Sequence, residues 1–297
     1  MTLSVKNGSA IVSRLVLVLC LVAAPVLSAA TPDFERAHKL YSLTEYTQSL
    51  KILQSLPEKD AHVWELIGRN YYMQGDFKKA SESFEKALAA SPEDSSLALW
   101  LGRAYGRRAE TASPFTAMGN AGKARQFFEK AVELNPHNVE ALNDLFEYYL
   151  EAPGFLGGGL DKAVGIAEKI RALDEVEGHW AQARLAEKRK EYSSAEEQLR
   201  RAAELAPQQV GRVLDLARFF SKQGRYQEAD QTFQRAETLA PNNPKVMYAR
   251  AETYVKSKRN LDTAKTLLRK YIAATDLTPD DPPRSDAEKL LRQAEGG

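Results

Sequence analysis

The chain has 297 residues, of which 43% are hydrophobic and 27% charged, an ordinary globular composition with ample apolar material for a core. Its formal net charge is +1, so the overall charge does not indicate nucleic acid or an anionic membrane as a partner. The chain contains one cysteine, which excludes an intramolecular disulfide framework.

The first thirty residues are predicted to be a cleavable signal peptide. Lys6 and Arg14 precede an apolar run at 15–27, and Ser-Ala-Ala at 28–30 places small residues where a signal peptidase cleaves. The run is shorter than the roughly 20 residues that a membrane span needs. An uncleaved anchor is the alternative interpretation.

Cleavage would remove Cys20, Lys6 and Arg14 and would bring the net charge from +1 to −1. The remaining chain would then have no thiol, and export into an oxidising compartment would not affect its covalent structure. We expect an exported protein, in the periplasm or outside the cell, with no membrane span after cleavage.

A repeated pattern begins in residues 61–94. It consists of small residues, aromatic residues, a turn glycine and a closing proline at fixed spacing: Trp64, Ile67, Gly68, Tyr71, Gly75, Phe77, Ala80, Phe84, Ala87 and Pro92. Small residues allow two antiparallel helices to approach closely, and aromatic residues fill the space beside them. The glycine suits a turn, and the proline ends the second helix.

The same frame recurs along the chain, first in a degenerate form at 32–60 and then clearly at 176–209, 210–243 and 244–281. A segment that begins near Ser285 or Asp286, either of which is a suitable N-cap, predicts a last helix that covers the open end. The domain organisation is therefore a signal peptide at 1–30, about seven repeats at 31–283, and a capping helix with a tail at 284–297.

These residues resemble the tetratricopeptide repeat family, in which Trp-x2-Leu-Gly-x2-Tyr is followed by Ala-x3-Phe and Pro across 34 residues. The resemblance covers nearly all of the chain after residue 30. It implies an all-α, right-handed superhelical solenoid of antiparallel helix pairs. It also implies a non-catalytic protein that binds a protein or peptide.

Two adjacent repeats carry insertions at the same place, near 106–123 and 150–162. The second, APGFLGGGLDKA, has two glycines at the spacing of the GxxxxGK[ST] phosphate loop. Leu160 and Asp161 stand where that loop needs lysine and a hydroxyl, and a helix rather than a strand precedes it. Nucleotide binding is therefore not expected, and both insertions are interpreted as loops between the helices of one repeat.

Stacking should place the two insertions side by side at one edge of the solenoid. We expect their apolar side chains to form one cluster there: Phe115, Met118, Phe155 and Leu156. In the first interpretation Phe115 packs over the glycine loop, and in the second this edge binds a partner.

In this family the first helix of each repeat lines the inner surface. The frame positions that face this surface give a set of candidate partner-binding residues in which arginine recurs in register: Arg69, Tyr72, Arg103, Arg107, Glu147, Trp180, Arg184, Lys188, Arg218, Lys222 and Tyr248. We expect an acidic peptide partner, with Arg184 and Arg218 as bidentate donors to its carboxylates. The alternative is a self-paired lattice of charges with Glu147, Glu187 and Glu252.

No motif indicates catalysis, a cofactor or a metal. The four histidines lack the HExxH spacing, no zinc set is present, and no G-x-S-x-G elbow occurs. The predicted function is a protein-binding scaffold or adaptor in the cell envelope, of unspecified partner and oligomeric state. The alternative is an enzyme, or the regulatory subunit of an envelope enzyme, with a site at the insertion edge.

Overall fold

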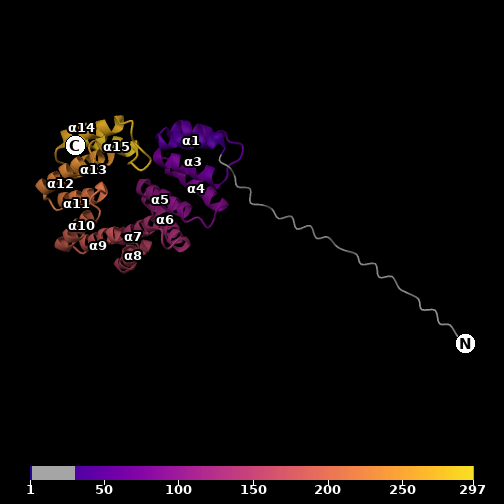
Figure 1. The fold of residues 1–297 in the computed structure, drawn as a ribbon, viewed down its shortest axis with the longest axis horizontal. Coiled ribbons are helices and arrows are strands. Elements are labelled where there is room, and N and C mark those ends of the chain that lie inside the picture. The colour runs from indigo at the N-terminus through magenta and orange to yellow at the C-terminus, as the bar shows by residue number, and fades with distance from the viewer. Residues whose placement is uncertain (2–30, 297) are drawn as a thin grey trace. The chain divides into compact units, whose positions relative to one another are not determined.

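The structure is a computed structural model that describes residue 1 and residues 31–296. The predicted signal peptide lies outside the described residues, apart from Met1. The unit Pro32–Gly297 is all-helical in its described part and contains no strand there. Figure 1 shows its helices arranged as hairpins that follow one another in chain order.

Seven helical hairpins precede a single last helix in the described residues. The first helices of the hairpins are α1 (Pro32–Ser42), α3 (Ala61–Met73), α5 (Ser95–Thr111), α7 (Val139–Glu151), α9 (Glu175–Lys188), α11 (Val210–Lys222) and α13 (Pro244–Lys256). The second helices are α2 (Tyr46–Ser55), α4 (Phe77–Ala90), α6 (Pro114–Leu134), α8 (Leu160–Leu173), α10 (Tyr192–Leu205), α12 (Tyr226–Leu239) and α14 (Leu261–Ala273). A short 3-10 helix, η1 (Gly154–Leu156), precedes α8, and α15 (Arg284–Gly296) ends the chain.

Acidic and amide side chains cap most of the first helices. The Asp60 carboxylate accepts from the Val63 amide, Asp94 from Ser96 and Leu97, and Asp174 from Glu177. Asn138 and Asn243 do the same at α7 and α13. Each cap satisfies amides that no helical carbonyl can reach, and it fixes where the next hairpin begins.

The two helices of a hairpin cross where the frame has its small residue and its aromatic residue. A Cβ at Gly68 would lie 2.7 Å from two carbons of the Phe84 ring, and one at Gly102 would lie 2.6 Å from two carbons of Phe128. The alanines at the matching position of the second helices are all buried: Ala80, Ala124, Ala163, Ala195, Ala229 and Ala264. The frame therefore identifies the contact surface of each hairpin.

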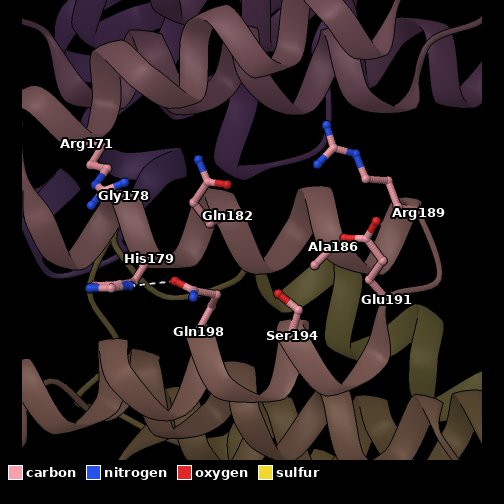
Figure 2. A pocket seen from close by; sticks show the side chains of 9 residues that line it. All are labelled: Arg171, Gly178, His179, Gln182, Ala186, Arg189, Glu191, Ser194 and Gln198. Carbon is pink, nitrogen blue, oxygen red and sulfur yellow. Dashed lines mark hydrogen bonds between the residues drawn. The ribbon is translucent and has the colours of Figure 1, made fainter.

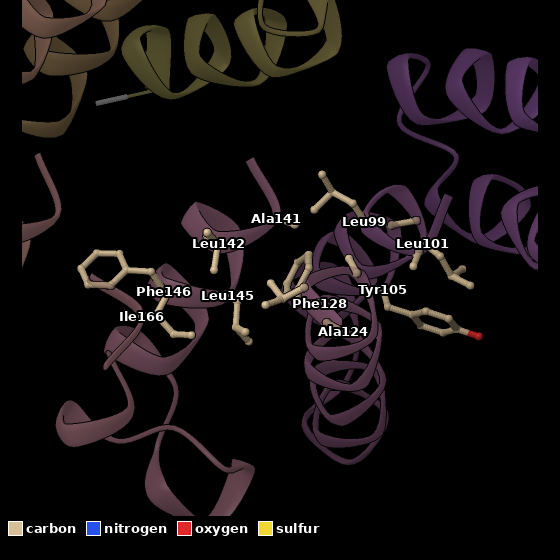
Figure 3. Packing of buried hydrophobic residues seen from close by; sticks show 14 of the residues in the cluster. Leu99, Leu101, Tyr105, Ala124, Phe128, Ala141, Leu142, Leu145, Phe146 and Ile166 are labelled. Carbon is tan, nitrogen blue, oxygen red and sulfur yellow. The ribbon is translucent and has the colours of Figure 1, made fainter. Parts of the chain in front are cut away.

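The largest core cluster runs from α4 to α9 and includes residues of four successive hairpins. Figure 3 shows Phe128 and Ala124 of α6 between Leu101 of α5 and Leu145 of α7. Each hairpin buries one face against the hairpin before it and one against the hairpin after it. At the last hairpin, α15 provides this cover by burying Ala287, Leu290 and Ala294.

The first insertion differs from the expected loop. It lengthens both helices of its hairpin, so that α5 has 17 residues and α6 has 21, against 13 and 14 in α3 and α4. Only Ala112 and Ser113 separate α5 from α6. The inserted residues up to Thr111 are mostly good helix formers, and Pro114 suits the first position of the new helix.

The last helix begins at Arg284, one or two residues before the expected N-cap. Ser285 and Asp286 consequently lie in its first turn and do not cap it. The Asp286 and Ala287 amides are bonded to the carbonyl of Pro283. Because they do not cap α15, the side chains of Ser285 and Asp286 can contact other helices.

Candidate functional site

The candidate arginines of the first helices lie on one side of the hairpin stack, which we call the inner face. It is defined by Arg103, Arg107, Arg184, Arg212 and Arg218 and by the carboxylates that they contact. The first helices also contact one another from repeat to repeat: α3 with α5, α5 with α7, α7 with α9, and α11 with α13. This stacking places side chains that are one repeat apart in sequence within ion-pair distance.

Arg184 is the most completely paired residue of the inner face. Its guanidinium donates to Glu147 at 2.8 and 3.0 Å and to Glu151 at 3.1 Å, and Glu187 lies 3.5 Å away. Lys188 pairs with the other Glu151 oxygen at 3.0 Å. The hydrogen bonds to Glu147 raise the pKa of Arg184 above its ordinary value. The bidentate role that the sequence predicts for Arg184 is therefore taken by a carboxylate of the same chain.

The N-terminal half of the inner face is also paired. Arg103 donates to Asp144 at 2.5 Å and to Glu140 at 3.4 Å, and Arg69 donates to Glu65 at 2.5 Å. The guanidinium of Arg69 also lies over the Trp100 ring, 4.8 Å from its centroid. Burial raises the pKa of Asp144, although the charge of Arg103 acts in the opposite direction.

Arg212, Glu177 and Asp215 extend this lattice and were not among the residues predicted from the sequence. Arg212 donates to Glu177 at 2.7 Å and to Asp215 at 3.0 Å, and burial raises the pKa of Asp215. Glu177 and Arg212 are 35 residues apart, as are Glu187 and Lys222, which also pair. Opposite charges one repeat apart are a sequence signal that would have identified both pairs. The self-paired lattice is therefore present on the inner face.

Arg218 is the exception among the arginines of α9 and α11. Its shortest ion-pair distances are 3.5 Å to Asp215 and 3.8 Å to Glu252, longer than hydrogen bonds to a guanidinium. A cavity of about 300 Å³ lies beside it, between α11 and α13. The cavity is lined by Arg218, Ser221, Lys222, Tyr226, Glu252, Thr253, Lys256 and Ser257, and we call it the Arg218 cavity.

The Arg218 cavity has three cationic side chains and one carboxylate. Lys256 pairs with Glu252 at 2.8 Å, and Lys222 extends to Glu187 at 3.0 Å. Ser221 is 9% exposed, and its hydroxyl forms no hydrogen bond within residues 31–296. The cavity therefore offers Arg218 and a hydroxyl donor to an incoming group, with an excess of positive charge. This arrangement suits a carboxylate.

Three aromatic side chains border the inner face as predicted from the sequence. Trp180 packs against Phe146, and Tyr72 packs edge-on against Trp100. Tyr248 contacts Tyr271, and burial is the largest cause that raises the pKa of Tyr248. The charges that surround its hydroxyl include Glu252, Asp286, Arg107 and Arg218. The Tyr248 hydroxyl is thus affected by the charges of both Arg218 and Arg107.

A second polar cavity, of about 240 Å³, lies between α8, α9 and α10. Figure 2 shows Arg171 and Arg189 toward opposite ends of it, with the hydrogen bond between His179 and Gln198 along one side. Neither arginine has an ion-pair partner within residues 31–296. Both arginine side chains are exposed and lie at opposite ends of the cavity, and the hydroxyl of Ser194 is exposed as well. This cavity therefore lacks the clustered cations and the partly buried hydroxyl of the Arg218 cavity.

The apolar side chains of the insertion edge, which were expected to form one cluster, are largely exposed. Phe115 is 86% exposed, Phe155 is 78% exposed and Met118 is 45% exposed, while Leu156 is half-buried. Phe115 therefore does not pack over the glycine loop, and that interpretation is wrong. Because the first insertion continues as helix, Phe115 lies in the first turn of α6, and a residue further along α6 faces the loop.

That residue is Arg125. A Cβ at Gly157, where φ is +87°, would lie within contact distance of the Arg125 guanidinium, 2.4 Å from one of its nitrogens. The loop is also held by hydrogen bonds from Tyr148 to the carbonyl of Leu156 and from Lys162 to that of Gly157. The second insertion thus contacts α6 just beyond the first insertion, through Arg125. Two aromatic side chains, Phe115 and Phe155, remain exposed.

The described residues contain no group of three His, Cys, Asp or Glu side chains arranged to hold a metal ion. In the same part of the chain no helix is long and apolar enough to cross a membrane.

Comparisons with known proteins match three separate repeats. Tetratricopeptide repeat models match residues 61–94, 115–138 and 214–245. None of the curated proteins compared matches the chain.

Two solved structures share the fold. A tetratricopeptide repeat protein from Parabacteroides merdae is 15% identical and has a TM-score of 0.57, with 89% of this chain and 97% of that chain covered. A thermophilic repeat protein of Thermus thermophilus is 22% identical and has a TM-score of 0.51, with 68% of this chain and 100% of that chain covered. Proteins built from such repeats are typically non-catalytic. The hairpin geometry and the three matches show that the chain belongs to the tetratricopeptide repeat family, whose repeats generally serve as scaffolds for protein–protein interaction.

Proposed function

We propose that the protein is an exported scaffold of a bacterial cell envelope, without catalytic activity of its own, that binds an acidic segment of a partner protein on its inner face. The Arg218 cavity is the proposed centre of this site. The observation that supports it most is the incomplete pairing of Arg218 beside a cavity that two lysines and a free hydroxyl also line. Arg184 and Arg103 are assigned a structural role, because carboxylates of the chain already hold them.

The chemistry of the cavity favours carboxylate over other groups. A guanidinium offers two parallel N–H donors that match the two oxygens of an aspartate or glutamate. Each such bond to a charged group contributes about 1.5–3 kcal/mol when water is largely excluded. Tyr226, which lines the cavity, supplies apolar contact area for the rest of a peptide.

Charge removal at the cavity tests the proposal. The probe is a fluorescein-labelled hexaglutamate peptide, and its anisotropy is measured at fixed ionic strength. We expect Arg218→Ala combined with Lys222→Ala and Lys256→Ala to weaken binding at least ten-fold, the equivalent of about 1.4 kcal/mol. The matched control removes Arg171, Arg189 and Arg235, an equal charge from residues without ion-pair partners in residues 31–296. Equal weakening by both triple variants would show non-specific attraction and would contradict the proposed site.

Export is proposed from the first thirty residues. Two basic residues, an apolar run and three small residues support it. N-terminal sequencing of the protein from an envelope or secreted fraction should find Thr31 as the first residue. Recovery of a chain that begins at Met1 would contradict cleavage.

The exposed aromatic residues of the insertion edge support this edge as a second binding surface. Phe115 and Phe155 are the most exposed phenylalanines of the described chain. A photoreactive amino acid at Phe155 would capture a partner if the edge is used. The same label at Tyr192, an exposed aromatic residue of α10, is the control.

A further inference from the structure

Three consecutive residues at the start of α15 contact the first three hairpins. Arg284 donates to the Thr44 hydroxyl at 3.0 Å, in the turn between α1 and α2. The Cβ position of Gly75, in the turn between α3 and α4, is 3.6 Å from the Ser285 hydroxyl. Arg107, near the end of α5, donates to Asp286 at 3.0, 3.1 and 3.2 Å. Arg284 and Asp286 thus bond to the ends of the first and third hairpins, and Ser285 lies beside the turn of the second.

The stacking of the last hairpins does not require these contacts. Burial of α15 against α13 and α14 is provided by Ala287, Leu290 and Ala294, which face the core cluster of the last hairpin. The contacts of residues 284–286 instead join the last helix to the first hairpins. Arg107 and Asp286 are 179 residues apart in the sequence, and Thr44 and Arg284 are 240 residues apart. Figure 1 shows α15 beside α1 and α3.

The Asp286 carboxylate accepts hydrogen bonds from Arg107, as an acidic side chain of a partner would. The Arg107 guanidinium lies over the Phe77 ring, 4.6 Å from its centroid, and its two terminal nitrogens point at the Asp286 carboxylate. Both side chains remain about a quarter exposed, so water and solutes can reach the pair. The other acidic contact of Arg107, with Glu110 at 3.2 Å, comes from its own helix.

This pair is close to the proposed binding site. The charges of Arg107, Asp286, Arg218 and Glu252 all act on the Tyr248 hydroxyl. The Tyr248 ring packs on Tyr271 of α14. An acidic segment bound at the Arg218 cavity would therefore act on the same hydroxyl as the Arg107–Asp286 pair.

We infer that the ends of the first three hairpins form a docking surface for residues 284–286, and that this contact is a latch that closes the inner face until an acidic partner displaces Asp286 from Arg107. The inference rests on the proposed function for the identity of the partner. The latch itself is a property of the free chain. It is therefore tested first without any ligand.

The first test measures opening of the full-length chain. Amide hydrogen exchange followed by mass spectrometry reports on residues 284–292, and small-angle X-ray scattering reports on the radius of gyration. Loss of a partly exposed bidentate pair should raise the opening equilibrium about five-fold. We expect Asp286→Ala and Arg107→Ala each to speed exchange by about this factor and to increase the radius of gyration.

The control is Glu295→Ala, which removes a carboxylate from the same helix. Glu295 pairs with Arg269 of the neighbouring α14 at 2.7 Å, so its loss leaves the contacts of residues 284–286 in place. Exchange at residues 284–292 that is no faster in Asp286→Ala than in Glu295→Ala would overturn the latch.

The second test uses the hexaglutamate probe. Asp286→Ala should bind the probe about two- to five-fold more tightly than Glu295→Ala, which has the same net charge. Equal affinities of these two variants would overturn the gating role, even if the Arg218 cavity variant still loses binding. Unchanged binding by the cavity variant would instead contradict the proposed function. The two failures are therefore distinguishable.

Discussion

Two glycines one turn apart in α5 provide a matched test of the hairpin packing. Gly102 faces α6, and a Cβ there would lie 2.6 Å from two carbons of the Phe128 ring and 3.3 Å from the carbonyl oxygen of Ala124. Gly106 lies in the same helix, and a Cβ there would meet nothing within 4 Å. Alanine at these two positions should therefore change stability in opposite directions.

The magnitudes follow from helix propensity and overpacking. Replacement of a helical glycine by alanine stabilises the helix by up to about 1 kcal/mol. At Gly102 the new methyl group would lie roughly 1 Å inside the normal carbon–carbon contact distance. Phe128 is 7% exposed and packs edge-on against Tyr148, so it has little space to move. An overpacking cost of about 3 kcal/mol, the upper end of the usual range, less a propensity gain of about 1 kcal/mol gives a net loss of about 2 kcal/mol for Gly102→Ala. The expected effect of Gly106→Ala is a gain of about 1 kcal/mol.

Thermal unfolding followed by far-UV circular dichroism measures both variants. A difference of about 3 kcal/mol corresponds to a separation of roughly 5–10 °C between the two midpoints in a domain of this size. We expect Gly102→Ala to melt below the parent protein and Gly106→Ala to melt at or above it. A shift of both variants in the same direction, or a more stable Gly102→Ala, would refute the packing argument.

Three further predictions concern charge, the insertion edge and pH. Arg184→Ala leaves Glu147, Glu151 and Glu187 close together without their cation. In urea titrations it should lower the free energy of unfolding by about 1–3 kcal/mol. Arg171→Ala, at a residue without an ion-pair partner in residues 31–296, should change this free energy by less than about 0.5 kcal/mol. Phe128→Ala should cost about 3–5 kcal/mol, whereas Phe115→Ser should be nearly neutral by the same measurement because its ring is exposed; a large loss for Phe115→Ser would contradict the exposed edge. The hydrogen bonds from Arg225 and Arg200 hold the pKa of Glu196 below its ordinary value. The unfolded chain therefore binds a proton at Glu196 more readily than the folded chain. The stabilisation from this group is present above about pH 4.3 and is lost as the pH falls through the lower folded pKa. Glu196→Gln should accordingly flatten the loss of stability below that pH, and an unchanged acid profile would contradict this assignment.

The local part of the fold could be predicted from the sequence. Contacts inside one hairpin follow the 34-residue frame, so the contact of Gly68 with Phe84 follows from spacing. The contact of Gly102 with Phe128 follows once the first insertion is allowed for. The first insertion was wrongly expected to be a loop, because an insertion into a turn is usually irregular. Ser113 and Pro114 are the signal that a new helix begins directly after α5.

The candidate site was predictable only in part. The repeat register of the sequence predicted that Arg103, Arg184 and Arg218 lie on one face. It could not distinguish a guanidinium that is fully paired with carboxylates from one that is not. That difference depends on which carboxylates of the next repeat reach each arginine. The contact between Arg107 and Asp286 was not predictable from spacing at all, because it results from the accumulated rotation of successive hairpins.

Site-specific photocrosslinking in the cells that express the protein tests the central claim most directly. A photoreactive amino acid at Tyr226, which lines the Arg218 cavity, is compared with the same label at Tyr192 on α10. The account predicts a covalent protein adduct from Tyr226 that disappears when Arg218, Lys222 and Lys256 are replaced by alanine, and no adduct from Tyr192. Adducts from Tyr226 that persist after this replacement, or adducts from Tyr192 alone, would contradict it.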